Sequence, residues 1–184
     1  MNHKLVGIQN GNPSILVMEY KVKSLFGLIQ NPIISSIALH GFVTGYNNVA
    51  VNRESELKYP KLEYLFYVLP IVYHQRSLDI FVSARSMQRA LEKDNSITIG
   101  LQERAIKMVA QTYEGLNLSF SKNLLTINKS NSTIELINTT KRIPLPNKMV
   151  NYDLLKIQRC AIQLGNIFAK TDDRNLQLYL NIRF

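Results

Sequence analysis

Two amphipathic helices followed by two short alternating segments are the feature that most limits how this chain can fold. Apolar residues recur at helical spacing over residues 99–124, with a short break at Gln111-Thr112. The segments Leu125–Ile127 and Ile134–Leu136 then alternate as strands do, with the polar residues Asn128–Ser132 between them. Two helices and a hairpin in this order are typical of a winged helix-turn-helix unit.

The segment before this unit is predicted to be helical as well, so the expected fold class is mainly α (α+β), with one small hairpin. Asn31-Pro32 should begin a helix, because an Asn side chain accepts hydrogen bonds from free amides and Pro suits the first helical position. We expect Gly45 to end this helix and Gly41 to let a neighbouring helix approach closely.

Further helices are predicted along the rest of the chain. A second helix should begin at Pro60 and be kinked or ended by Pro70, since a prolyl nitrogen has no hydrogen to donate. Others are expected over Ser83–Asp94, after a cap at Thr98, after a cap at Thr112, and over Asp153–Lys170, which should be the longest. The last residues allow two interpretations: they alternate as a strand, or Asp172-Asp173 caps a short helix that stops at Asn181.

Length and composition fit one compact globular domain with an extension. The chain has 184 residues, of which 46% are hydrophobic and 19% are charged, so a core can form without disulfide bonds. We expect residues 31–184 to form that domain, after an N-terminal extension, residues 1–30, with a short strand at Ile15–Met18. Residues Thr139–Val150 should form an irregular connection.

Cysteine usage and hydropathy indicate a cytoplasmic protein without a membrane segment. The single cysteine, Cys160, cannot form an internal bridge and lies on an apolar helical face, so it should be a buried core residue. The longest apolar run, Tyr64–Tyr73, is shorter than the ~20 residues that a membrane span needs. The first residues lack the apolar region of a secretory signal.

The net charge of +9 is unevenly distributed. Residues 99–170 carry ten lysines and arginines against four acidic residues. The positive electrostatic potential of such a basic region attracts polyanions and acidic partners. A nucleic-acid surface and a merely solvated basic surface both remain open at this stage.

Patterns that support catalysis are not found in the sequence. The eight glycines are scattered and form no phosphate-binding loop, so no nucleotide cofactor is expected. The histidines His3, His40 and His74 lack the spacing of metal ligands, and no metal is expected. His40 and His74 are interpreted as structural residues. We therefore expect a protein that is not an enzyme and acts through its surfaces.

The basic hairpin region is the candidate nucleic-acid site. Five side chains could contact phosphates, because the wing lies along the backbone in this type of unit: Lys122, Lys129, Lys141, Arg142 and Lys148. The second predicted helix, Tyr113–Asn123, carries only Lys122 as a cation and offers no arginine to read guanine. Binding of double-stranded DNA should then be independent of sequence. Use of the same fold for protein docking alone is an equal alternative.

Six segments in order resemble those of the middle components of three-component ABC-ATPase conflict systems, of which Lamassu defence is one type. The first, after Asn31-Pro32, is Gly41–Tyr46. The others are Leu65–His74 (similar to "LLFLVLPLVLH"), Gly100–Ala105 ("GFxxRA"), Thr112–Leu116 ("TREAL"), Leu164–Ala169 ("LGRWFA") and Asn181–Phe184 ("GVRP"). Three positions depart from the family pattern: Asn166 replaces an arginine, Asn181 a glycine and Phe184 a proline.

The resemblance implies a non-enzymatic accessory subunit. Such proteins are encoded between an SMC/Rad50-like ABC ATPase and an effector, often a nuclease. Their presumed work is to bridge the two when phage or plasmid DNA is sensed, and no catalytic residue is carried over. Two alternatives remain: a stand-alone winged-helix DNA-binding transcriptional regulator, and an enzyme of unrecognised type.

Overall fold

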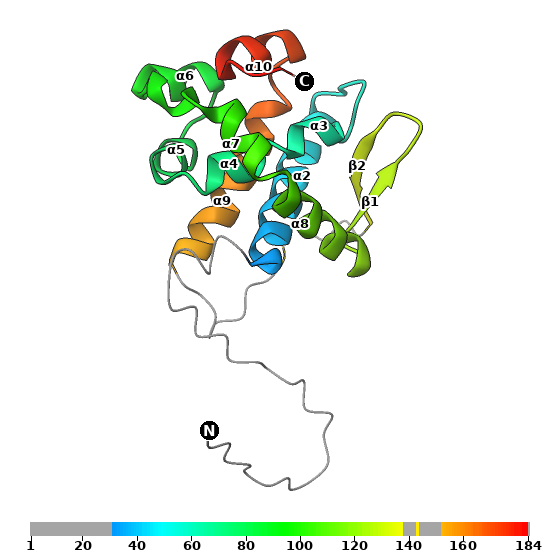
Figure 1. Ribbon diagram of the computed structural model, residues 1–184. Coiled ribbons are helices and arrows are strands. Elements are labelled where there is room, and N and C mark those ends of the chain that lie inside the picture. The colour runs from blue at the N-terminus through cyan, green and yellow to red at the C-terminus, as the bar shows by residue number, and fades with distance from the viewer. Residues whose placement is uncertain (1–30, 138–142, 144–151, 184) are drawn as a thin grey trace, which may run out of the picture.

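The computed structural model describes residues 31–137, 143 and 152–183, and these form a mainly helical fold with one small sheet (Figure 1). The helices are α2 (Pro32–Asn52), α3 (Leu62–Leu65), α4 (Val68–Val72), α5 (Gln75–Phe81), α6 (Met87–Lys93), the 3-10 helix η1 (Asn95–Thr98), α7 (Leu101–Lys107), α8 (Val109–Ser121), α9 (Tyr152–Phe168) and α10 (Asp173–Leu180). The strands are β1 (Leu125–Asn128) and β2 (Thr133–Leu136). The predicted fold class is confirmed.

Part of the predicted organisation cannot be compared with the structure. The extension of residues 1–30, with its strand at Ile15–Met18, lies outside the described residues. So does the connection Thr139–Val150 except for Ile143.

Helix α2 is the centre of the fold and packs against α9, α8 and β2 (Figure 1). It begins as predicted, because the Asn31 side chain accepts a hydrogen bond of 2.9 Å from the Ile33 amide. Every residue from Ile34 to Tyr46 is buried. A helix that is buried on all sides needs mainly small or apolar residues all round, and this stretch consists of them apart from His40.

The prediction that Gly45 ends the first helix is wrong, since α2 continues to Asn52. Gly45 lies instead at the closest approach of α9, where an added Cβ would be 2.0 Å from the Ile162 carbonyl oxygen. Gly41 also faces α9, as predicted, although its added Cβ would be 3.4 Å from the nearest atoms. With 21 residues, α2 is also longer than the 17-residue α9, against the prediction for Asp153–Lys170.

The segment after Pro60 forms two short helices, α3 and α4, rather than one helix that Pro70 kinks or ends. The break falls at Phe66-Tyr67, and Pro70 lies inside α4. Pro70 is the third residue of α4, where an amide hydrogen would have no partner in the helix, so a proline is tolerated. Helix α5 was not anticipated from the sequence.

The caps of the next three helices also differ from the prediction. Helix α6 begins later than Ser83, with Ser86 as its cap. Helix α7 follows Gly100, whose φ of 65° favours glycine, and Thr98 instead ends η1. The break before α8 is at Met108, and the Thr112 hydroxyl donates to the Met108 carbonyl from within α8 instead of capping it.

The hairpin forms in the predicted place, with Leu125 opposite Leu136 and Ile127 opposite Ile134. Backbone hydrogen bonds extend it on the β2 side. The Ile134 amide donates to the Pro60 carbonyl at 3.0 Å, and the Leu62 amide to the Ser132 carbonyl at 2.8 Å. The hairpin is therefore fixed to the start of α3.

The C-terminal segment is a helix, which decides between the two interpretations of the sequence. Asp172 caps α10 by accepting from the Asn175 amide at 2.9 Å, and Asn181 ends the helix with a left-handed φ of 52°. Before it, α9 packs its apolar face on α2 and buries Cys160 completely, as predicted. Burial raises the pKa of the Cys160 thiol.

Candidate partner-binding surface

Most segments that carry the family resemblance lie in the core, where they hold the helices together. Gly115 of α8 approaches α2 so closely that an added Cβ would be 2.7 Å from the Ser35 Cβ. One turn away, the hydroxyls of Ser36 and Ser119 are 2.8 Å apart and buried. These contacts explain the small residues on the inner face of α8.

Three of those segments meet at the end of the chain. The Gln102 side-chain oxygen accepts from the Arg183 amide at 3.1 Å and lies 2.9 Å from the Tyr67 hydroxyl. The same hydroxyl is 2.8 Å from the Arg183 carbonyl oxygen. These bonds fasten the residues after α10 to α7 and to the start of α4, so the segments have a structural role here.

A second polar contact joins α3 to α10. The Lys61 ammonium and the Tyr64 hydroxyl both bond to the Asp173 carboxylate. Burial alone would raise the pKa of Asp173, but the hydrogen bonds from Lys61 and Tyr64 lower it below its ordinary value. The bond with Asp173 raises the pKa of Lys61, and burial followed by the bond to Asp173 raises that of Tyr64. Lys61 therefore stays protonated, and its positive charge is balanced by the Asp173 carboxylate.

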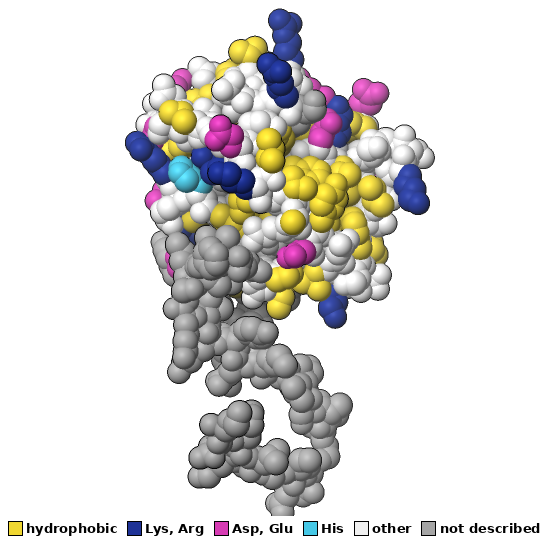
Figure 2. Space-filling model, in the orientation of Figure 1, with side chains coloured by type: hydrophobic (Ala, Val, Ile, Leu, Met, Phe, Trp, Pro, Cys, Tyr) yellow, Lys and Arg dark blue, Asp and Glu magenta, His cyan; other side chains and the backbone are white. Residues whose placement is uncertain are grey.

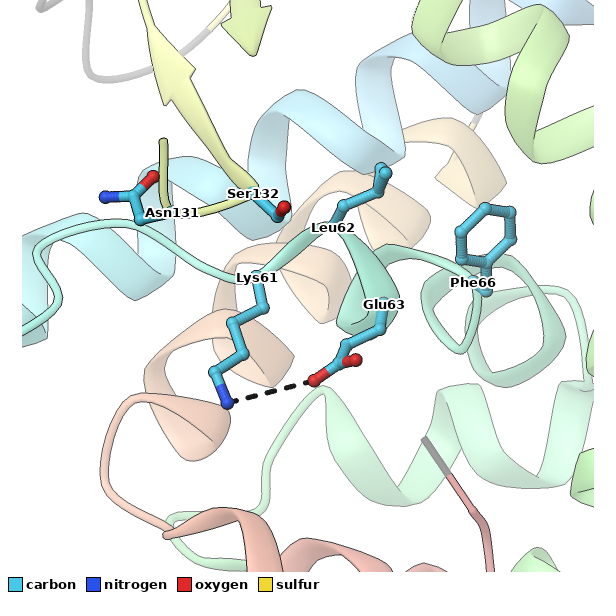
Figure 3. Close-up of a pocket in the computed structure, with 6 residues that line it drawn as sticks. All are labelled: Lys61, Leu62, Glu63, Phe66, Asn131 and Ser132. Carbon is cyan, nitrogen blue, oxygen red and sulfur yellow. Dashed lines mark ion pairs between the residues drawn. The ribbon is translucent and has the colours of Figure 1, made fainter. Parts of the chain in front are cut away.

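An open pocket of about 260 Å³ lies between α3 and the hairpin turn (Figure 3). Its lining residues are Lys61, Leu62, Glu63, Phe66, Asn131 and Ser132. Figure 3 shows Lys61 and Glu63 turned toward one another, away from Leu62, with 3.8 Å between the charged atoms. The lining surface is mainly apolar, and Leu62 and Phe66 are its apolar residues.

The pocket continues into an exposed apolar surface on α8. Phe66 packs edge-on against Tyr113, with 5.3 Å between ring centroids and 72° between ring planes. Tyr113 is 49% exposed, and Leu62 and Phe66 are half-buried. We call Leu62, Phe66 and Tyr113 the α3–α8 patch. Figure 2 shows hydrophobic side chains gathered over α3 and α8, with both acidic and basic side chains around them.

The sequence did not single out this patch. It placed Tyr113 in a helix but assigned no role to it. The spacing did contain a signal for an exposed aromatic residue. Thr112 and Leu116 share the buried face of the helix, and Tyr113 lies outside that face. Which α3 residues would meet Tyr113 depends on contacts between segments that are distant in sequence.

The predicted DNA-contacting residues are only partly described by the structure. Lys122 caps the end of α8, Lys129 lies in the hairpin turn, and both are exposed. They lie beyond opposite ends of β1, so the structure does not bring them into one cluster. Lys141, Arg142 and Lys148 lie outside the described residues.

The described histidines have structural surroundings. His40 is 2% exposed within α2, and burial lowers its pKa. The Nδ1 atom of His74 lies 2.8 Å from the Ser77 hydroxyl, and burial followed by the nearby Arg104 and Arg76 lowers the His74 pKa. In the described ranges, side chains of His, Cys, Asp and Glu form no group of three that could hold a metal ion.

None of the helices in the described part of the chain combines the length and the apolar character required to cross a membrane.

Comparisons with known proteins identify the family. Residues 20–184 match the family described as ABC-three component (ABC-3C) system Middle Component 3. No curated protein matches the chain significantly. No solved structure does so either. Because the family match covers nearly the whole chain, the protein belongs to the Middle Component 3 family of ABC-three component systems.

Proposed function

We propose that this protein is a non-catalytic accessory subunit of a prokaryotic defence system. In this account it bridges an SMC/Rad50-like ABC ATPase and an effector, a nuclease, and acts against phage or plasmid DNA as in Lamassu-type systems. The family match carries the proposal, since a middle component of an ABC-three component system works together with other components. We also propose a cytoplasmic location, where such an ATPase would meet invading DNA.

The described surface supports a role in assembly. The α3–α8 patch offers exposed aromatic area beside an open pocket, and aromatic side chains carry much of the binding energy in protein interfaces. The described part of the chain holds no group of side chains that could bind a metal ion. Of its two described histidines, His40 is buried and His74 contacts the Ser77 hydroxyl. Binding through surfaces therefore fits these residues better than bond-breaking chemistry.

Direct contact with double-stranded DNA is a further part of the proposal. Lys122 and Lys129 are exposed beside the hairpin, and Lys141, Arg142 and Lys148 follow it in the chain. Helix α8 presents Tyr113, Glu114 and Asn117 to solvent without an arginine, which favours contact with phosphates over base reading. The unit would then act as a sequence-independent winged helix.

Pairwise binding tests this function. The full chain, the ABC ATPase of the same system and its third component are purified and mixed in pairs, with and without ATP. We expect the chain to bind each of the two others in a fixed ratio, and alone to hydrolyse neither ATP nor DNA. Robust hydrolysis by the isolated chain would overturn the proposal. Specific binding of one DNA sequence by an isolated homodimer would favour a stand-alone regulator instead.

A further inference from the structure

We propose that the α3–α8 patch is the docking site for a basic, amphipathic segment of the ABC ATPase. A bulky apolar side chain of that segment would enter the pocket beside Phe66, and its flanking lysines or arginines would face Glu63 and Glu114. The inference rests on the proposed function and adds to it the surface and the chemistry of the partner.

The shape of the patch suits an apolar anchor. Leu62 and Phe66 line a pocket of about 260 Å³, and Tyr113 extends the apolar area onto α8. Phe66 and Tyr113 already contact each other at 5.3 Å between ring centroids. A partner side chain can therefore bury two rings without first ordering them, which lowers the entropy cost of binding.

The charges around the patch select the partner. Glu63 stands in sequence between Leu62 and Phe66, and Glu114 directly follows Tyr113. Within the described part of the chain, Glu114 is exposed and makes no ion pair.

Lys61 is the basic residue of the pocket lining, and it is shared between two carboxylates. These are the carboxylates of Asp173 and Glu63. Glu63 and the exposed Glu114 beside the patch disfavour DNA and attract a cationic protein segment. The patch and the basic hairpin region therefore suit different partners.

Binding of the full chain to the purified ABC ATPase tests the site. The variants are Tyr113→Ser, which removes an anchor, and Glu114→Lys, which reverses the rim charge. We expect Tyr113→Ser to weaken binding by about tenfold or more, as for a central interface aromatic. We expect Glu114→Lys to weaken it by about fivefold at low salt, with a smaller effect at high salt, because salt screens rim charges.

Two matched variants control for the substitutions themselves. Leu178→Ser removes an apolar side chain that is 69% exposed on α10, and Glu92→Lys reverses an exposed charge on α6. Both should bind the ATPase as the unchanged protein does. Circular dichroism should show the same helix content for all four variants, since each altered side chain is exposed.

The outcomes separate this inference from the function on which it rests. If the unchanged chain binds the ATPase and both patch variants bind equally well, the site is wrong while the accessory function stands. If the patch variants lose the third component and keep the ATPase, the assigned partner is wrong. If the unchanged chain binds neither component, the proposed function fails first.

Discussion

Gly165 of α9 and Gly45 of α2 each lie against the backbone of the opposite helix. An added Cβ on Gly165 would be 2.1 Å from the Phe42 carbonyl oxygen and 2.7 Å from the Tyr46 amide nitrogen. The corresponding atom on Gly45 would meet the Ile162 carbonyl at 2.0 Å. The two central helices can pack at this distance only because both positions lack a side chain.

Alanine at either glycine should separate the two helices. We expect Gly45→Ala and Gly165→Ala to lower the free energy of unfolding by roughly 2 kcal/mol or more, because backbone atoms cannot move aside as a flexible side chain can. Gly41→Ala is the matched control, since its added Cβ would lie 3.4 Å from its neighbours and should cost less than about 1 kcal/mol. Urea denaturation measures all three. Equal losses at Gly41 and Gly45 would contradict the packing described here.

Asn181 ends α10 in the left-handed backbone conformation, which glycine adopts most easily. Asn tolerates a φ of 52° better than other residues with a side chain. We expect Asn181→Gly to leave the free energy of unfolding within about 0.5 kcal/mol of the unchanged protein, and Asn181→Val to lower it by about 1–2 kcal/mol. Thermal unfolding of both variants provides the measurement. A valine variant as stable as the glycine variant would argue against the left-handed conformation.

Burial of His40 should make stability depend on pH near neutrality. The pKa of His40 in the folded protein lies below its ordinary value of 6.5 because burial disfavours the charged ring. The stabilisation is therefore complete above pH 6.5 and decreases as the pH falls toward the folded pKa, where the unfolded chain binds more protons. The loss from this one group is at most about 1.4 kcal/mol per pH unit.

Replacement of His40 by Gln isolates that contribution. The pKa of His74 is also lowered, so some pH dependence should remain in His40→Gln. We expect the variant to lose less unfolding free energy than the unchanged protein between pH 7 and pH 5, a window about the ordinary histidine pKa of ~6.5. Urea denaturation at several pH values measures the difference. Identical slopes for the two proteins would mean that folding does not shift the pKa of His40, as expected for an exposed ring.

Charge reversal near the hairpin should weaken any binding of double-stranded DNA. We expect Lys122→Glu combined with Lys129→Glu to lower affinity for all sequences alike and to reduce the steepness of the salt dependence, because fewer counterions are released. Lys93→Glu combined with Lys170→Glu, at exposed positions on α6 and after α9, is the control with the same change in net charge. Titration of random and of fixed-sequence duplexes over a range of salt tests this. An unchanged salt slope would show that these lysines do not contact phosphates.

The sequence predicted best the features that depend on neighbouring residues. The cap at Asn31 and the strands of the hairpin arise from local hydrogen bonds and alternation, and both are confirmed. The helix capped at Asp172 was one of two interpretations that the sequence left open. The apolar spacing of α9 predicted its buried face for the same reason, because one helix turn fixes which residues share a face. The basic candidates Lys141, Arg142 and Lys148 stay a prediction.

The errors arose where a distant contact decides the outcome. Gly45 has the local character of a helix end, but close packing against α9 keeps it inside α2. Pro70 is typical of a helix break, but it lies in the first turn of α4, where its missing amide hydrogen costs no hydrogen bond within the helix. The α3–α8 patch was missed because Phe66 and Tyr113 are brought together only by the fold.

A bridging measurement tests the central claim most directly. The ABC ATPase and the effector of the same system are mixed with and without this chain, and their association is followed by analytical ultracentrifugation. We predict that the effector sediments with the ATPase only when the chain is present, in one complex of fixed composition. Equal association of effector and ATPase without the chain would contradict its role as the subunit that joins them.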